Sequence, residues 1–318
     1  MARKAESDSD RLDDAARAGW LYYIAGNTQD EIARKLGVSR QTAQRLVSLS
    51  VSEKLIKVRL DHPIGHCLEL SEKVKQRYGI DYCEVVPSDP ESTSTTIGVA
   101  EAAAAELERH LVSQHPIIVA IGTGRMLRAM VDQLQAMDCP QHKIISLVGN
   151  ITPDGSASRF DVISRIADVV KAPHYPMPLP VVATTVHEKS LLLAQKPLRN
   201  VLELARQADI TFVGIGTLDN EAALLRDGFV RADEIRALVR AGAVGEIIGW
   251  AFDESGRLID GLTNDRVLSV PLEQPATRRV IGVAMAVPRL RAIKGALHGR
   301  LINGLITNER IAELLLEE

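Results

Sequence analysis

The stretch GNTQDEIARKLGVSRQTAQRLV, residues 26–47, predicts two short helices joined by a tight turn. Thr28 carries a hydroxyl that can cap the first helix, and Glu31 can reach back to close a capping box. Gly37 follows the apolar positions of this helix and suits the left-handed conformation in which many helices end. Ser39 is a good N-cap for the second helix. The pattern is that of a helix-turn-helix.

The second helix, expected over residues 40–48, has one apolar arc and one polar arc. Ala43, Leu46 and Val47 share the apolar arc of the helical wheel. Arg, Gln, Ser and Thr side chains hydrogen-bond base edges and phosphates, so the polar arc suits the major groove of DNA. The predicted DNA-binding residues are Thr28, Gln29, Ser39, Arg40, Gln41, Thr42, Gln44 and Arg45. A solvated hairpin of an all-α domain is the alternative, but the two caps, the turn glycine and the polar arc together favour DNA binding.

The flanking segments extend this unit to residues 1–60. Residues 12–25 predict a preceding helix that supplies apolar surface to the hairpin. Residues 55–60, LIKVRL, alternate as a strand does and predict a wing, with Lys57 and Arg59 able to contact phosphates. The unit holds 11 Lys and Arg against 8 Asp and Glu, while the remainder holds 27 against 33. An excess of three positive charges is small, so strong DNA binding requires two or more copies.

Length and composition indicate a globular protein of about two domains. The 318 residues are 46% hydrophobic, which is enough to bury a sizeable core. The N-terminus has no apolar signal core, and no apolar run approaches the ~20 residues of a membrane span. The three cysteines, Cys67, Cys83 and Cys139, are scattered and odd in number. We therefore expect a cytoplasmic protein with reduced thiols.

After a linker helix expected over residues 61–80, whose packing partner the sequence leaves open, strands and helices alternate. Continuous apolar runs predict strands at residues 116–121, 143–148, 211–215, 246–252 and 280–287. Alternation of this kind favours an α/β domain with a mainly parallel sheet over residues 81–318. The predicted fold is thus an N-terminal winged helix-turn-helix followed by a doubly wound α/β effector domain.

Glycine-rich or polar residues follow several of these strands, at the edge where open α/β sheets bind ligands. Gly122, Thr123, Gly124 and Arg125 follow the first run, and the helix after them would present its positive end to an anion. A Gly-x-Gly turn also closes strands for steric reasons alone. A second glycine-rich stretch after a predicted strand, GIGT at residues 214–217, favours a binding pocket.

The chain resembles the SorC family of bacterial sugar-binding transcriptional regulators, which is sometimes grouped with DeoR-like proteins. The resemblance covers nearly the whole chain. It rests on WLYYIAGNTQDEIARKLGVSRQTAQRLV (20–47), AIGTGRML (120–127), FVGIGT (212–217), GAVGEIIGWAFDESGRLID (242–260) and RAIKGALHGRLINGLITNERIAELLL (291–316).

The resemblance implies an effector domain related to sugar-phosphate isomerases and glucosamine-phosphate deaminases, which binds a sugar or sugar phosphate. It also implies a homotetramer that represses or activates a sugar-utilisation operon. The implied effector-binding residues are Gly122, Thr123, Gly124, Arg125, Gly149, Asn150, Gly216, Thr217, Asp253 and Lys294. A turn residue and a solvated helix residue are the alternative interpretations of Asp253 and Lys294. Met126 stands where many members have Ser or Thr, which keeps an unphosphorylated sugar alcohol open as the ligand.

Three other functions are alternatives to this one. An isomerase or deaminase-like enzyme needs a placed general base, and the expected acidic cluster is not visible in the sequence. A nicotinamide site needs a third glycine and a ribose-binding acid. A metal site from His62, His66 and Cys67 conflicts with Pro63, which interrupts the helix that would align them. We expect operator DNA and a small-molecule effector as partners, with no enzyme activity, cofactor or metal.

Overall fold

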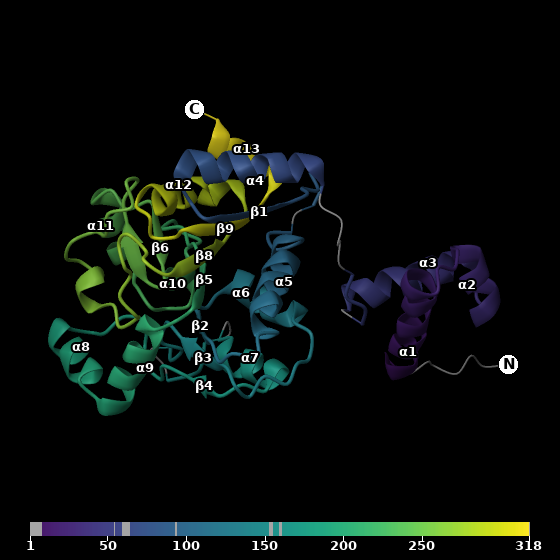
Figure 1. Cartoon of the computed structure of the whole chain (residues 1–318), viewed down its shortest axis with the longest axis horizontal. Coiled ribbons are helices and arrows are strands. Elements are labelled where there is room, and N and C mark those ends of the chain that lie inside the picture. The colour runs from purple at the N-terminus through teal and green to yellow at the C-terminus, as the bar shows by residue number, and fades with distance from the viewer. Residues whose placement is uncertain are drawn as a thin grey trace. The chain divides into compact units, whose positions relative to one another are not determined.

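A computed structural model describes residues 8–53, 55–58, 64–92, 94–152, 155–158 and 161–317 (Figure 1). Internal contacts divide the chain into two compact units, residues 1–62 and residues 63–318. The linker helix α4 (Gly65–Tyr78) belongs to the second unit, where it packs against helix α13 (Glu309–Leu316) and strand β1 (Tyr82–Val86).

The N-terminal unit contains the predicted helix-turn-helix. Its elements are α1 (Asp8–Gly19), the π-helical turn η1 (Trp20–Ile24), α2 (Gln29–Leu36) and α3 (Arg40–Ser52). The capping box is present, because Thr28 Oγ1 accepts from the Glu31 N–H at 3.3 Å and Glu31 Oε2 accepts from the Thr28 N–H at 2.8 Å. Gly37 is left-handed with φ of +67°, and Ser39 Oγ accepts from the Thr42 N–H at 3.1 Å. The polar hydrogen bonds expected from the sequence therefore set both helix starts.

The predicted wing strand is wrong over residues 55–58, because residues 55–56 form a bend and residues 57–58 have no regular structure. The N–H groups of Leu55 and Ile56 both donate to the carbonyl of Ser50, at 2.8 and 3.2 Å, and turn the chain back on the end of α3. The Ile56 side chain then lies against Gly19 at the end of α1. A strand needs a hydrogen-bonded neighbour, and the described part of the N-terminal unit provides none. Arg59 and Leu60 lie outside the described residues.

The second unit is built on a seven-stranded sheet in the order β1–β9–β8–β5–β2–β3–β4, with every neighbouring pair parallel. Besides β1, the strands are β2 (Ile118–Ile121), β3 (Lys143–Ser146), β4 (His174–Tyr175), β5 (Ile210–Gly214), β8 (Arg279–Val283) and β9 (Gly304–Asn308). Parallel strands covered on both faces are continuously apolar, which explains the runs in the sequence. The doubly wound α/β prediction is confirmed.

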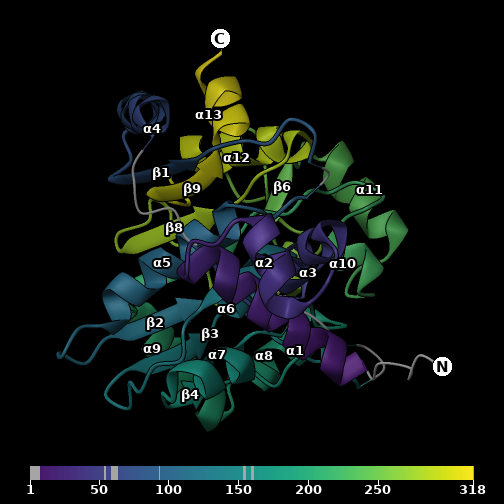
Figure 2. The same cartoon turned by 90° about the vertical axis from the view of Figure 1, so that its right-hand side faces the viewer.

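Helices surround this sheet. They are α5 (Val99–Leu111), α6 (Arg125–Gln133), α7 (Ile163–Val170), α8 (Val186–Leu193), α9 (Lys196–Arg206), α10 (Ala223–Arg226), α11 (Ala232–Arg240) and α12 (Leu290–His298), with short 3-10 turns η2 (Asn264–Arg266) and η3 (Val287–Arg289). Figure 1 shows α4, α12 and α13 gathered at the β1–β9 end of the sheet and α7 and α9 at the β3–β4 end, and Figure 2 shows the same grouping after a 90° turn.

The single strand predicted at residues 246–252 is wrong. This segment forms a separate antiparallel hairpin of β6 (Gly245–Ile247) and β7 (Trp250–Phe252). Ile248 and Gly249 have φ of +46° and +89°, and such left-handed residues at the turn reverse the chain after three residues. The hairpin therefore lies outside the parallel sheet, and the polar residues after it do not share the sheet edge.

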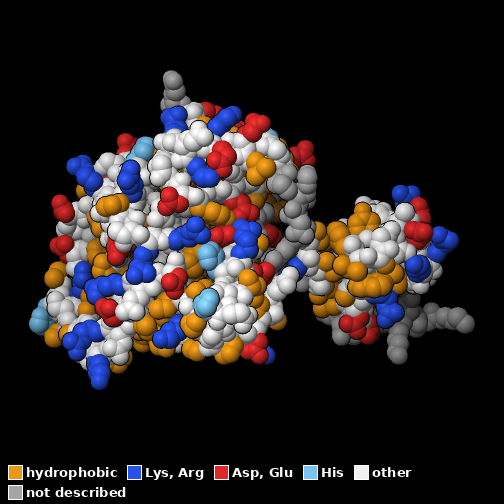
Figure 3. Space-filling model, in the orientation of Figure 1, with side chains coloured by type: hydrophobic (Ala, Val, Ile, Leu, Met, Phe, Trp, Pro, Cys, Tyr) orange, Lys and Arg blue, Asp and Glu red, His pale blue; other side chains and the backbone are white. Residues whose placement is uncertain are grey.

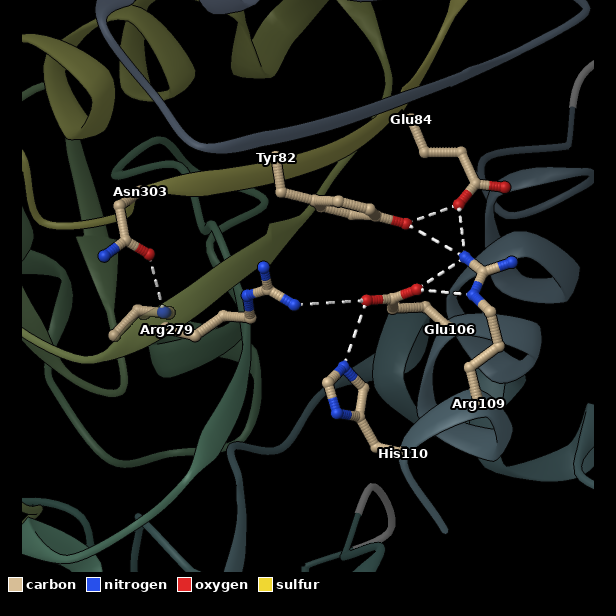
Figure 4. Close-up of polar contacts among 8 residues, drawn as sticks. Tyr82, Glu84, Glu106, Arg109, His110, Arg279 and Asn303 are labelled. Atoms are coloured by element: carbon tan, nitrogen blue, oxygen red, sulfur yellow. Dashed lines mark hydrogen bonds and ion pairs between the residues drawn. The ribbon is translucent and has the colours of Figure 1, made fainter. Parts of the chain in front are cut away.

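A network of charges around Glu106 ties α5 to Glu84 of β1 and Arg279 of β8 (Figure 4). The buried Glu106 carboxylate accepts from Arg109 Nε at 2.7 Å and lies 3.2 Å from His110 Nε2 and 4.0 Å from Arg279 Nη1. Arg109 also donates to Glu84 Oε2 on β1 at 3.0 Å. Burial raises the pKa of Glu106, but the hydrogen bonds from His110 and Arg109 outweigh it and lower this pKa to about 2. The ionised carboxylate and Arg109 together link α5 to β1 and β8.

Candidate functional site

The two glycine-rich loops lie side by side at the switch point of the sheet. From β2 the chain proceeds to β3 and β4 on one side and then returns to place β5 on the other side. The loops after β2 and β5 therefore diverge at their carboxyl ends and leave a crevice, where open α/β sheets bind ligands. Residues 122–125 and 214–217 occupy these positions.

A pocket opens at this crevice, with about 980 Å³ of open space including its mouth. Five of the ten effector-binding residues implied by the resemblance line it, namely Thr123, Gly124, Arg125, Gly216 and Thr217. The β6–β7 hairpin forms another wall with Glu246, Ile248 and Gly249. Loop and helix residues from 221–229 and 283–289 complete it, including Phe229, Met285 and Arg289. Apolar walls with a few polar groups are typical of small-molecule sites.

Two glycines in these loops are there for different physical reasons. Gly124 precedes α6 with φ of +115°, a conformation that side chains rarely adopt, and open space lies where its Cβ would be. Its backbone can therefore approach a ligand at the positive end of α6. A Cβ on Gly216 would instead overlap the Glu246 carboxylate. Gly216 thus makes room for an acid rather than for the ligand.

Glu246 is the acid that the hairpin presents to the pocket. Its backbone exchanges two hydrogen bonds with Gly216, at 2.9 and 3.0 Å, which fasten the hairpin to the loop after β5. Its carboxylate accepts from the Gly249 N–H at 2.7 Å. Burial raises the pKa of Glu246, although the Gly249 hydrogen bond and the charge of Arg289 act in the opposite direction. A carboxylate held in this way can accept hydrogen bonds from ligand hydroxyl groups.

Three arginines, Arg125, Arg226 and Arg289, line the same pocket. Arg289 is half-buried, and its Nη1 donates to the carbonyl of Met285 at 3.1 Å. Burial lowers the pKa of Arg289, and the positive charges of Arg125 and Arg226 also lower it, while the negative charges of Asp219 and Glu246 act in the opposite direction. A bound anion would reduce the electrostatic repulsion between neighbouring arginines. The acids Glu221, Asp227 and Glu246 also line the pocket, so it suits a ligand with hydroxyl groups as well as an anionic group.

The other five residues implied by the resemblance do not line this pocket. A Cβ on Gly122 would crowd Ile248, and a Cβ on Gly149 would overlap the Leu179 backbone, so close packing favours glycine at both positions. Asn150 Nδ2 donates to Asp161 Oδ2 at 3.2 Å. Asp253 and Lys294 need a separate explanation.

Asp253 and Lys294 are not among the residues that line the pocket. Asp253 follows the hairpin, where its Oδ1 accepts from the N–H groups of Ser255 and Arg257 at 2.9 and 3.0 Å, and its Oδ2 pairs with Arg257 at 3.1 Å. These contacts are the ones expected of the turn residue in the alternative interpretation, and effector binding by Asp253 stays a prediction. Lys294 lies half-buried in the middle of α12, and the residues that line the pocket end at Arg289, before this helix begins.

Sequence reasoning missed Glu246 and Arg289. Glu246 stood inside a run interpreted as one buried strand, and its polar character between apolar neighbours was the signal that the run was interrupted. Arg289 follows Pro288 at the start of a helix, where Pro is common at the first positions. The proline therefore indicates a helical segment that begins near residue 287, closer than Lys294 to the end of the preceding strand.

The predicted DNA-binding residues are presented mainly by the first half of α3. Arg40, Gln41, Thr42, Gln44 and Arg45 are all exposed, whereas Ala43, Leu46 and Val47 are buried against the other helices. Arg40 lies 3.5 Å from Asp30 on α2. Thr28 and Ser39 are engaged as caps, and Gln29 is half-buried at the start of α2. A helix with exposed polar residues at its N-terminal end has the form of a recognition helix that enters a major groove.

The candidate metal ligands do not converge. Cys67 Sγ is directed at Glu309 Oε1 at 3.5 Å, and His66 Nε2 lies 3.8 Å from Glu313. His62 lies outside the described residues. Within the part of the chain that the structure describes, no three His, Cys, Asp or Glu side chains gather as a metal site.

Comparisons with known proteins agree with the two units. Residues 62–317 match the family model described as "Putative sugar-binding domain". The erythritol catabolism regulatory protein EryD of Brucella abortus (strain 2308) is 32% identical over 302 residues, which cover 95% of this chain and 96% of that protein. The transcriptional regulator LsrR of Klebsiella pneumoniae subsp. pneumoniae is 30% identical, with 95% and 92% of the two chains covered.

The whole fold matches a solved structure of the same kind. The crystal structure of the full-length sorbitol operon regulator SorC from Klebsiella pneumoniae superposes with a TM-score of 0.70 at 26% identity, over 97% of this chain and 100% of that one. These relatives are regulators, and the alternative of an isomerase- or deaminase-like enzyme finds no support among them. The chain belongs to the SorC family of DeoR-like, sugar-binding transcriptional regulators.

Proposed function

We propose that this regulator binds a polyol or sugar, preferentially as its phosphate ester, in the pocket at the β2–β5 switch point, and that the bound ligand changes its affinity for operator DNA. The observation that carries the proposal is the grouping of Arg125, Arg226 and Arg289 with the Gly124 backbone at the start of α6. A phosphate would hydrogen-bond the arginines and the helix N-terminus together.

Glu246 supplies the other half of the recognition. Its carboxylate is positioned by Gly249 and faces the same pocket as Thr123 and Thr217. These oxygens suit the hydroxyl groups of an open-chain or cyclic polyol. Two relatives bear the names of polyol pathways, the erythritol regulator EryD and the sorbitol operon regulator SorC, and they make a polyol-utilisation operon the favoured target.

The proposed DNA-contacting surface is the exposed polar arc of α3. We propose that Arg40, Gln41, Thr42, Gln44 and Arg45 contact the operator, with Thr28, Gln29 and Ser39 near the phosphates. DNA affinity would respond to ligand if subunits of a homotetramer change arrangement and alter the spacing of their recognition helices. Within the described residues no helix is long and apolar enough to span a membrane. We propose that the protein acts in the cytoplasm, because the operator DNA that it would bind lies there.

The test is a gel shift with DNA from upstream of the protein's own operon. It includes erythritol, sorbitol, the phosphate esters of both, and inorganic phosphate. We expect a retarded complex whose apparent affinity changes with at least one phosphate ester and much less with the free polyol. An equal response to the free polyol would refute the phosphate preference, and no complex under any condition would refute the function.

Two matched variants separate the two sites. Arg45→Ala should abolish operator binding but preserve the thermal stabilisation by ligand, because Arg45 lies on α3 and outside the pocket. Arg289→Ala should retain operator binding and lose the response to ligand. Lys294→Ala serves as the control, since Lys294 does not line the pocket, and we expect it to respond as the wild type does. Loss of the response in Lys294→Ala alone would move the site away from this pocket.

A further inference from the structure

The segment that follows β8 separates two pockets. Met285 lines both the pocket at the β2–β5 switch point and a second pocket, which has about 1280 Å³ of open space including its mouth. Arg289 lines the first of them, and Ala286 and Val287 line the second. We call residues 285–289 the partition. A movement of the partition therefore changes both pockets.

The partition is strained, and Arg289 holds it in place. Ala286 has φ of +93° and ψ of +131°, a conformation that residues with a side chain rarely adopt. The Arg289 N–H donates to the Ala286 carbonyl at 2.9 Å, and Arg289 Nη1 donates to the Met285 carbonyl at 3.1 Å. A phosphate that binds the guanidinium competes with the Met285 carbonyl, because hydrogen bonds between ionised groups are the stronger ones.

The second pocket contains two exposed apolar side chains from different segments. Val287 lies on the partition, and Ile97 lies in the loop between β1 and α5; both line this pocket and are 54% and 51% exposed. Contact between apolar side chains that leave water is favourable in proportion to the area buried. A partition released from Arg289 can thus relieve the strain at Ala286 and bury Val287 against Ile97.

The loop that carries Ile97 is tied to the linker helix α4. At its start the Ser88 N–H donates to Glu309 Oε2 at 2.9 Å, and Ser88 Oγ accepts from the Arg310 N–H at 3.1 Å. Glu309 Oε1 in turn accepts from Cys67 Sγ at 3.5 Å, in the first turn of α4. In Figure 3 charged side chains of both signs lie over α4 and α13. The first turn of α4 is therefore held from its inner face, where Cys67 is buried.

We propose that the partition is a switch through which the ligand acts on α4. The anionic group of the ligand draws Arg289 away from the Met285 carbonyl, and Val287 closes on Ile97. The loop then shifts, and Ser88 no longer holds Glu309 against Cys67. This inference rests on the proposed function, because the phosphate of the ligand is the trigger. It goes beyond that function by naming the residues that connect the pocket to the helix following the DNA-binding unit.

Alkylation of Cys67 reports the state of the switch. Burial raises the pKa of Cys67 to about 11, and the hydrogen bond to Glu309 also raises it. The thiolate is the reacting form, so release from Glu309 should accelerate alkylation severalfold. Iodoacetamide is added to the full-length chain with and without the phosphate ester of sorbitol, and peptide mass spectrometry compares Cys67 with the buried Cys139. An unchanged or slower reaction of Cys67, with ligand binding shown by calorimetry, would overturn the proposal.

Matched variants test the parts of the switch. Val287→Ser should bind ligand but lose the acceleration at Cys67, because Val287 does not line the ligand pocket. Val112→Ser, at an exposed valine after α5 that lines neither pocket, should respond as the wild type does. Ala286→Gly should weaken the acceleration, because glycine adopts this backbone conformation without strain. Full acceleration in both Val287→Ser and Ala286→Gly would refute the switch.

A covalent closure tests the switch without any ligand. The double variant Ile97→Cys, Val287→Cys is oxidised with diamide, and a disulfide requires the two Cβ atoms to come within roughly 3.5–4.5 Å. We expect this disulfide to form and Cys67 to react severalfold faster than in the reduced double variant, with the two single variants as controls. Absence of the disulfide in folded protein, or an unchanged Cys67 rate once it has formed, would overturn the proposal. Failure of every phosphate ester to bind in calorimetry would instead refute the proposed function.

Discussion

Glu246 and Gly216 exchange two backbone hydrogen bonds, at 2.9 and 3.0 Å, and the Glu246 side chain fills the space in which Gly216 lacks a Cβ. This pair joins the β6–β7 hairpin to the loop after β5 at the wall of the pocket. By its sequence, Gly216 belongs to a glycine-rich loop of the phosphate-binding kind. Its contacts in the structure instead position the Glu246 carboxylate at the pocket wall.

Gly216→Ala should displace the Glu246 carboxylate and weaken ligand binding at least tenfold. The new Cβ meets three atoms of the Glu246 side chain, and overpacking of this kind costs about 1–3 kcal/mol of stability. Calorimetric titration and thermal unfolding measure the two effects. Gly214→Ala is the control, because it lines the same pocket but its Cβ would be 3.7 Å from the nearest atom, the Thr123 carbonyl oxygen. In a Glu246→Ala background, Gly216→Ala should lower the free energy of unfolding by less. An unchanged loss of stability would contradict the proposed overlap between the new Cβ and the Glu246 side chain.

Glu246→Gln should stabilise the ligand-free protein near pH 7 while weakening its response to ligand. Burial raises the pKa of Glu246, so the ionised form opposes folding at pH values above that raised pKa, and this penalty disappears below the ordinary value of 4.5. A glutamine keeps an oxygen for the Gly249 N–H without the charge. Urea unfolding at pH 7 and at pH 4 measures the difference. A stabilisation of equal size at both pH values would show that the charge is not its origin.

Loss of the Glu106 network should make the protein less sensitive to acid. Because hydrogen bonds lower the folded-state pKa of Glu106 from 4.5 to about 2, its contribution to stability is complete above pH 4.5 and is lost as the pH falls toward 2. Glu106→Gln should therefore destabilise the protein by roughly 2–3 kcal/mol at pH 7 and by clearly less at pH 3. Chemical denaturation gives both values. Glu69→Gln, on the exposed side of α4, should show neither effect.

Removal of the cap at α2 should weaken DNA binding through stability. Thr28→Ala deletes the oxygen that accepts the Glu31 N–H and costs about 1 kcal/mol. Hydrogen exchange of the α2 amides measures the local loss. Thr28→Ser keeps the hydroxyl and should retain both the protection and the operator affinity. If Thr28→Ala lowered operator affinity without loss of protection, Thr28 would act by contact with DNA rather than as a cap.

Local sequence patterns predicted the structure best where one short segment contains all the interacting groups. The capping box of Thr28 and Glu31, the left-handed Gly37 and the Ser39 cap depend on residues three or four positions apart, and the structure reproduces them. The apolar runs likewise predicted the parallel strands, since burial on both faces leaves a mark on each strand separately. The wing failed because a strand requires a partner that its own alternation does not reveal.

The sequence by itself determined the helix-turn-helix, the α/β class and the two glycine-rich loops, because each is written in neighbouring residues. Only the tertiary structure decided which side chains meet in the pocket. The strand order brings residues 122–125 and 214–217 together, the hairpin turn at Ile248 and Gly249 directs Glu246 to them, and the early start of the last helices brings Arg289 rather than Lys294. Contacts between residues distant in the chain depend on topology and packing, and no local periodicity encodes these.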